Sequence, residues 1–193
     1  MTVASRPELD PGRVYRTRDL APWSANPPRL ARRLVDEGQL VPLAHGLFAH
    51  PKRGRFGVVS PSDEEILRAF LDDTPFVFTG PERWNALGLG STAIFAMPLV
   101  YNTKRSGMFE LGGRKFLLRR VAFPEVPPPE WYVVDLVEHA DQAGVARSTV
   151  MKALTVAVAN GRFDRNKLRA MAERYATRVT RALVESAIHP SAA

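Results

Sequence analysis

Residues 26–51 read NPPRLARRLVDEGQLVPLAHGLFAHP and contain the signals of a short helix followed by two short apolar segments. Asn26 is a good helix N-cap, and the proline after it suits the first helical position, where the backbone amide has no partner within the helix. Gly38 can adopt the left-handed conformation that ends many helices. The apolar side chains between residues 30 and 35 form one stripe, so this side of the helix is expected to pack on a core.

The opposite side of the expected helix carries Arg29, Arg32 and Arg33. Residues 40–43 and 47–49 are short enough to form a hairpin through the turn around His45. A helix with arginines on one face and leucines on the other can lie in the major groove of DNA while it packs on its own domain. The alternative is a solvent-exposed helix face in a small α/β unit. The hairpin that follows favours a winged helix-turn-helix that binds DNA.

Charge and composition are compatible with a polyanionic partner. The chain has 193 residues, of which 45% are hydrophobic and 24% charged, and its net charge is +7. Residues 1–60 carry a net charge of +5, residues 61–160 of −2 and residues 161–193 of +4, so two basic ends flank a nearly neutral middle. The absence of cysteine excludes disulfides and cysteine-type zinc sites.

Membrane and secretion signals are weak. The N-terminus lacks the apolar segment of a signal peptide. The longest apolar run, residues 93–101, contains a proline and is far shorter than the roughly 20 residues that span a bilayer. We therefore expect a cytoplasmic protein without a membrane partner.

The first 60 residues are predicted to form one small domain. Residues 1–12 show no period and are expected to be an irregular lead-in, and one or two helical turns follow over residues 17–21 with Thr17 as N-cap. The basic, glycine-rich segment KRGRFG at residues 52–57 is predicted to be a connector. The expected domains are therefore a winged-helix domain at residues 1–57 and a second domain at residues 58–193.

The second domain is predicted to contain a small sheet and several helices, which makes the fold class α+β. Ser62 and Glu65 form a capping box ahead of an apolar helix. The Gly112-Gly113 pair is typical of a primed hairpin turn. Helices are expected near residues 131–142, 147–159, 164–175 and 177–188, with apolar stripes that include Phe163, Leu168, Met171 and Tyr175 in the third and Val179, Leu183 and Ile188 in the fourth.

The order of these segments resembles the AbiEi-type antitoxins of type IV toxin–antitoxin systems, in particular their DUF6088 branch. The similarity lies in VYRTRDL, in LARRLVDEGQLVPLAHGLFAHPKR, in FGVVSP and in FELGGRKFLLRR, and it covers roughly residues 13–140. The resemblance implies a winged helix that represses its own operon, joined to a C-terminal domain that antagonises a nucleotidyltransferase-like toxin. The expected partners are thus double-stranded DNA of its own promoter and, as a functional partner, a cognate toxin, with or without a stable complex between the two proteins.

The residues expected to contact DNA share exposure and, in most cases, positive charge. Those of the helix would read bases or phosphates, and those before and after it would hold the DNA backbone. They are Arg16, Thr17, Arg18, Arg29, Arg32, Arg33, His45, Lys52, Arg53 and Arg55.

Two further basic sets are interpreted as solvent-exposed faces, with a partner surface as the alternative. One comprises Lys104, Arg105, Arg114, Lys115, Arg119 and Arg120, and the other Arg162, Arg165, Lys167, Arg169, Arg174, Arg178 and Arg181.

Catalytic patterns are few, and we expect no enzyme, no cofactor and no metal. Asp135 and His139, four residues apart, are typical of an ordinary side-chain pair on a helix. The glycines around Leu89 lack the dinucleotide-binding pattern. The alternatives to a DNA-binding regulator are a protein-interaction module that uses the winged helix without specific DNA binding and, third, a nuclease using Glu110 and Lys115.

Overall fold

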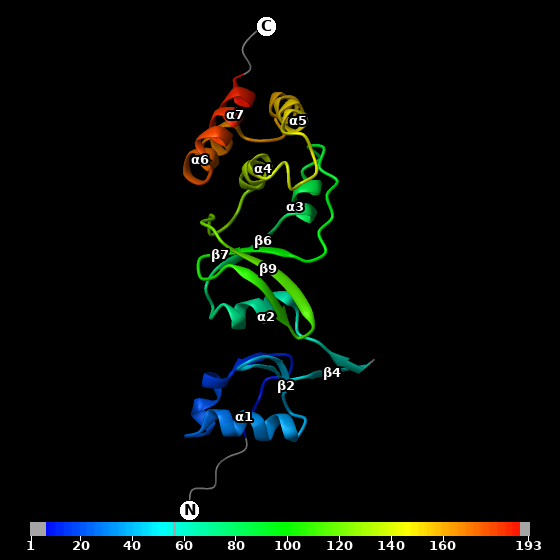
Figure 1. Cartoon of the computed structure of the whole chain (residues 1–193), viewed down its shortest axis with the longest axis vertical. Coiled ribbons are helices and arrows are strands. Elements are labelled where there is room, and N and C mark those ends of the chain that lie inside the picture. The colour runs from blue at the N-terminus through cyan, green and yellow to red at the C-terminus, as the bar shows by residue number, and fades with distance from the viewer. Residues whose placement is uncertain (1–6, 56, 190–193) are drawn as a thin grey trace, which may run out of the picture. The chain divides into compact units, whose positions relative to one another are not determined.

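The computed structural model describes residues 7–55 and 57–189, which form two compact units (Figure 1). The first unit contains the chain up to Pro75 together with Met108–Phe116, and the second contains Phe76–Gly107 and the chain from Leu117 onward. Helices and strands occur in both units, which confirms the α+β class. The expected domain boundary at residue 57 stays a prediction.

A three-stranded antiparallel sheet organises the first unit. Its order is β1-β3-β2, with β1 at Val14–Arg16, β3 at Leu47–Ala49 and β2 at Val41–Ala44. The 3-10 helix η1 (Thr17–Trp23) and helix α1 (Pro27–Asp36) lie between β1 and β2 in the chain. Their apolar sides meet the sheet in a core of Tyr15, Leu20, Leu30, Ala31, Leu34 and Leu40.

Both predicted ends of α1 are confirmed. The Asn26 side chain accepts a hydrogen bond from the Arg29 amide at 3.1 Å, which satisfies one of the amides that a helix start leaves unpaired. Gly38 has a φ of +68°, and its amide donates to the Val35 carbonyl at 2.9 Å. Local residue types thus set the length of this helix.

The predicted cap of the preceding helix is wrong by one residue. Arg16, not Thr17, is the N-cap of η1. The Asp19 carboxylate accepts a hydrogen bond from the Arg16 amide at 2.8 Å. Thr17 is instead the first residue of the helix.

The segment predicted as a connector forms a two-stranded antiparallel hairpin of β4 (Lys52–Gly54) and β5 (Gly57–Val59), here called the basic hairpin. Helix α2 (Asp63–Phe70) follows, with the predicted capping box of Ser62 and Glu65 in place. Its residues Ile66 and Leu67 are fully buried.

A four-stranded sheet has the order β6-β7-β9-β8, with β6 at Phe76–Thr79, β7 at Leu99–Asn102, β8 at Gly107–Leu111 and β9 at Arg114–Arg120. β7 is antiparallel to β6 and parallel to β9. Gly112 and Gly113 join β8 to β9 with φ of +59° and +78°. Positive φ at both positions is the signature of a type I′ turn, one of the primed turns that the sequence predicts.

Helices supply most of the core of the second unit. They are α3 (Pro81–Ala86), α4 (Pro129–Glu138), α5 (Arg147–Ala159), α6 (Arg165–Tyr175) and α7 (Arg178–Ile188). The four predicted C-terminal helices are present within a few residues of the expected bounds. Val179 was expected on the apolar stripe of α7 but is 62% exposed, and Val184 is buried in its place.

Candidate nucleic-acid interface

Helix α1 has its apolar side chains on one side and its arginines on the other, as the sequence predicts. Leu30 and Leu34 are buried, whereas Arg29, Arg32 and Arg33 are exposed. Because residues three and four apart are neighbours on a helix surface, the three arginines form one continuous basic face.

The ion pairs of this face are sparse. Arg33 lies 3.7 Å from the Glu37 carboxylate, measured from Nε to Oε1, and both side chains are about half exposed. Arg29 and Arg32 make no salt bridge to any residue that the structure describes. Their guanidinium groups are therefore available to an external anion.

Arg16 and Arg18 have a different environment. The Arg16 guanidinium contacts the Asp19 carboxylate at 3.1 Å and pairs with Asp72, and Asp73 lies 3.6 Å away. Arg18 also pairs with Asp72, although its side chain is 61% exposed. Since Arg16 is mostly covered and surrounded by carboxylates, the structure gives it an internal role at the end of β1.

Thr17 connects the start of η1 to the turn of the β2–β3 hairpin. Its amide donates to the Gly46 carbonyl at 2.9 Å, and its hydroxyl lies 3.5 Å from the same oxygen. Gly46 has a φ of +71°, a conformation that suits glycine. His45, beside it, is exposed at the tip. This contact fixes the hairpin turn relative to the helices.

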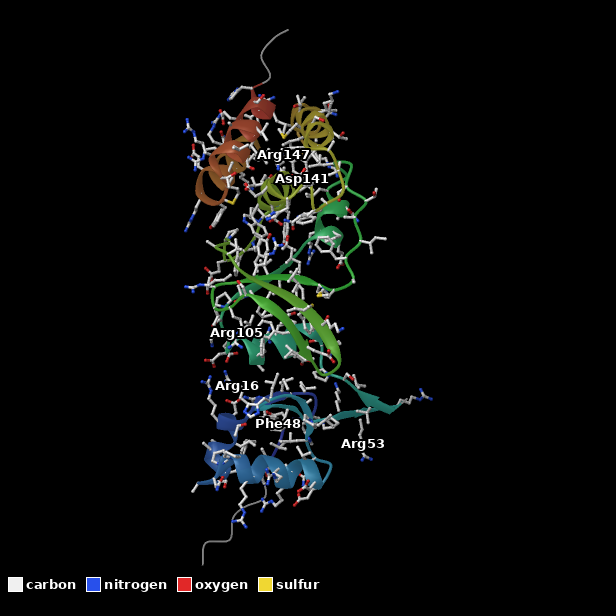
Figure 2. All side chains as sticks on the ribbon, in the orientation of Figure 1. Arg16, Phe48, Arg53, Arg105, Asp141 and Arg147 are labelled. Atoms are coloured by element: carbon white, nitrogen blue, oxygen red, sulfur yellow. The ribbon has the colours of Figure 1, made fainter. Side chains whose placement is uncertain are left out.

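The remaining expected residues, Lys52, Arg53 and Arg55, are all exposed on the basic hairpin. Figure 2 shows the Arg53 side chain on this hairpin. No aspartate or glutamate occurs from residue 38 to residue 62. The surface contributed by β2 to β5 thus carries positive charge without neutralising carboxylates of its own.

The two other basic sets have several internal partners. In the first set, Arg114 pairs with Asp63, and Arg119 donates to Gln142 at 3.3 Å. In the second set, Arg169 pairs with Glu185 at 3.0 Å, and Arg181 donates to the Glu173 carbonyl at 2.8 Å. These contacts agree with the interpretation of both sets mainly as ordinary protein surface.

The predicted pair of Asp135 and His139 is confirmed, but sequence reasoning missed the buried polar cluster that surrounds it in the second unit. Asp135 is 6% exposed, and its Oδ2 accepts hydrogen bonds from the Thr79 hydroxyl and, at 2.8 Å, from the indole of Trp84. Its Oδ1 accepts from Tyr101 at 3.0 Å and lies 3.2 Å from the imidazole of His139. The carboxylate joins β6, α3, β7 and α4. The available signal was an acid inside the apolar run WYVVDLV.

The cluster changes the titration of its members. Burial, followed by the charge of Asp135, raises the pKa of Tyr101 far above its usual range. Burial lowers the pKa of His139, but hydrogen bonding and attraction to Asp135 outweigh this effect, so that the net pKa is raised. Because donors occupy both oxygens of Asp135, the arrangement is suited to holding the unit together rather than to binding a ligand.

The part of the chain that the structure describes contains no group of three or more histidine, aspartate or glutamate side chains placed to hold a metal ion. Within the same residues, every helix is too short or too polar to cross a bilayer.

No protein-family model and no curated protein sequence matches the chain. Among solved structures, the chain is similar to the crystal structure of the RV2827C protein from Mycobacterium tuberculosis, with a TM-score of 0.53 and 16% sequence identity. The match covers 91% of this chain and 72% of that chain. At this level of identity the likeness concerns the fold alone.

Proposed function

We propose that the protein is a DNA-binding transcription regulator that acts in the cytoplasm and places α1 in the major groove of its own promoter. The observation that carries the proposal is the division of α1 into two sides. Arg29 and Arg32 are exposed without an ion partner among the described residues, while Leu30 and Leu34 anchor the opposite side in the core. A helix held in this way presents its arginines at fixed spacing.

The surrounding elements support a winged helix-turn-helix. η1 precedes α1 and the β2–β3 hairpin follows it, which is the order of two helices and a wing. The contact between Thr17 and Gly46 ties η1 to the hairpin turn, so His45 at the tip is held close to the helices. Lys52 and Arg53 extend the positive surface and suit contacts with phosphates.

We further propose that the regulator is the antitoxin of a type IV toxin–antitoxin pair. The support is the sequence resemblance to AbiEi-type antitoxins, which covers both the winged-helix segment and the β8–β9 hairpin. In this proposal the second half of the chain antagonises a nucleotidyltransferase-like toxin without needing a stable complex with it.

DNA binding is tested by measuring the affinity of the full chain for its own upstream DNA and for random DNA across salt concentrations. The variants are Arg29→Ala, Arg32→Ala and Arg33→Ala, and Arg165→Ala, exposed on α6, is the matched control. An arginine that reads bases loses about 1–3 kcal/mol of discrimination between the two DNAs. An arginine that holds a phosphate weakens both and lowers the log–log salt slope by about 0.9. Wild-type affinity and slope in all three variants would refute the role of α1.

The antitoxin role is tested separately by co-expressing the full chain with the nucleotidyltransferase-like protein encoded beside it. We expect growth to be restored by wild type and also by the triple variant of Arg29, Arg32 and Arg33 to alanine, because neutralisation is assigned to the other half of the chain. Continued toxicity in the presence of folded wild-type protein contradicts this role and leaves the DNA-binding proposal intact.

A second candidate is a protein-interaction module that uses the winged helix without specific DNA binding. The observation in its favour is that Arg16, Arg18 and Arg33 already have carboxylate partners within the chain. Affinity for DNA that is weak and equal for all sequences would favour this candidate.

A further inference from the structure

The connection between α3 and β7, residues 87–98, is here called the uncharged loop. Most connections between helices and strands have roughly 4–6 residues, so this loop is unusually long. No aspartate, glutamate, lysine or arginine occurs from residue 84 to residue 103, although 24% of the chain is charged. The exposed residues of the loop are all small or apolar, and they are Gly88, Gly90, Thr92, Ile94, Ala96 and Pro98. The centre of a protein interface is likewise depleted in charged residues.

Ile94 projects from the uncharged loop because the residues on either side of it are fixed. The side-chain amide of Asn85 donates to the Ala93 carbonyl at 2.9 Å. Phe95 packs edge-on against Trp84, with 5.9 Å between the ring centroids. The Ile94 residue between these two anchors is 92% exposed. The loop therefore holds an apolar side chain in water at a fixed place, and a contact that is ordered in advance costs less entropy when a partner binds.

A groove of about 450 Å³ borders the start of the same loop. Its apolar lining consists of Gly88, Ala153, Val156 and Ala157. Val156 is 61% exposed, so this part of α5 leaves apolar surface in contact with water. Pockets of roughly 300–1,000 Å³ accommodate whole small-molecule ligands, so this groove has room for an isoleucine side chain.

The uncharged loop begins alongside α5 (Figure 1). Gly88 has a φ of +62°, and an added Cβ would lie 3.2 Å from both terminal nitrogens of the Arg162 guanidinium. A Cβ added to Gly90 would lie 3.4 Å from a methyl group of Thr149, in the first turn of α5. Glycines thus let the loop lie directly against its neighbours. The residues that connect the groove to Ile94 carry no charge.

We propose that the uncharged loop is a dimer interface in which Ile94 of each copy enters the groove beside Val156 of the other copy. The chain supplies both a projecting side chain and an apolar groove to receive it, which identifies a second copy as the occupant. In a twofold dimer this contact occurs twice. Because each chain has a net charge of +7, two copies repel where their charged faces meet. The uncharged loop is a surface on which this repulsion is small, and the dimer does not require the proposed DNA binding.

Two cations determine how the contact responds to a charge at position 94. The polar lining of the groove consists of Lys152, Asn160 and Arg162. A positive side chain at position 94 would approach both cations of the second copy, whereas a negative one would be attracted to them. Ile94→Lys is therefore expected to weaken the dimer more than Ile94→Glu does.

Sedimentation equilibrium of the full chain measures the dissociation constant of the dimer. We expect wild type to dimerise, Ile94→Lys to raise the dissociation constant by about tenfold or more, and Ile94→Glu to raise it less. Ala170→Lys, at an exposed position of α6, is the matched control and behaves like wild type. Because the replaced side chains are exposed, the variants keep the fold, which circular dichroism checks.

Crosslinking tests which residues meet. The chain contains no cysteine, so cysteines introduced singly are linked without background. Ile94→Cys and Val156→Cys are prepared separately, mixed and treated with a short bismaleimide. We expect the mixture to form linked dimers several times faster than either variant alone, because Ile94 of one copy lies beside Val156 of the other. Ala170→Cys in place of Val156→Cys removes this advantage.

A wild-type chain that stays monomeric into the millimolar range overturns the proposed dimer, and so does a dimer that Ile94→Lys leaves intact. A dimer that Ile94→Lys and Ile94→Glu weaken equally, or that shows no preferential link between positions 94 and 156, also overturns it, because the groove is then not the receiving site. None of these results bears on the proposed DNA binding, which is tested with the three arginines of α1.

Discussion

Arg16 pairs with Asp72, although 56 positions separate them in the chain. Arg16 ends β1, and Asp72 follows α2 with a φ of +63°, a conformation that only a few residue types other than glycine adopt readily. The pair therefore joins the sheet of the first unit to the end of its last helix. It also explains why an arginine of the motif VYRTRDL has an internal role.

Asp72→Asn is expected to destabilise the first unit by roughly 1 kcal/mol, because it removes the charge that Arg16 and Arg18 share while asparagine tolerates the same backbone conformation. The free energy of unfolding in urea is the measurement. Asp10→Asn is the control, since its pair with Arg13 is more than half exposed on both sides. Equal effects of the two replacements would show that the Asp72 contacts stabilise the first unit no more than an exposed ion pair does.

The two glycines of the β8–β9 turn provide a matched pair. Gly113→Ala is expected to cost roughly 1–2 kcal/mol from its left-handed backbone alone, since nothing lies within 4 Å of the added methyl group. Gly112→Ala has the same strain and also meets Leu43, at 2.8 Å from Cδ2. We expect Gly112→Ala to lower the thermal midpoint further than Gly113→Ala. A reversed order would show that Leu43 moves aside without cost.

Asp135→Asn is expected to be strongly destabilising, by about 3 kcal/mol or more, because the buried donors of Thr79, Trp84 and Tyr101 lose the charge that they share. Asp141→Asn is the control, because Asp141 is 85% exposed and lies 3.5 Å from Arg147. Denaturant unfolding followed by tryptophan fluorescence measures both variants. A small effect at Asp135 would mean that the cluster is not central to the second unit.

The stability of the second unit should decrease as the pH rises through the pKa of His139. This pKa is raised in the folded state, because attraction to Asp135 outweighs burial and the repulsion from Arg119. The folded state then binds the proton more tightly than the unfolded state, so the stabilisation is complete below the ordinary pKa of 6.5 and is lost above the folded value.

His139→Gln should remove this part of the pH dependence. The measurement is the free energy of unfolding at about pH 5.5 and about pH 8.5, on either side of the ordinary pKa of histidine. The same difference between the two pH values in wild type and variant would assign the dependence to another group.

Features that depend on neighbouring residues could be predicted from the sequence. The ends of α1 follow from Asn26 and Gly38, and the β8–β9 turn follows from its two glycines, because capping and left-handed turns are decided within a few residues. The exposed arginine face of α1 could be predicted for the same reason, since it requires only the helical period.

Features that depend on distant contacts could not be predicted. The partner of Arg16 comes from the far end of α2, and the donors around Asp135 come from three other elements. Val179 was placed on the wrong side because the apolar residues of α7 fit more than one stripe, and packing selected Val184. The basic hairpin was missed because its strands are short and exposed, so they lack the alternating apolar pattern of a buried strand.

The route of the chain between the two units restricts how the protein can be dissected. The first unit takes Met108–Phe116 from within the part of the chain that builds the second. A single cut after Pro75 would therefore leave the N-terminal fragment without this segment and the C-terminal fragment with an insertion that has lost its surroundings. Fragment complementation, in which the two pieces are expressed together and reassemble, suits this molecule better than truncation. Exchange of whole units with a related chain would need two junctions around the β8–β9 hairpin in addition to the one after Pro75.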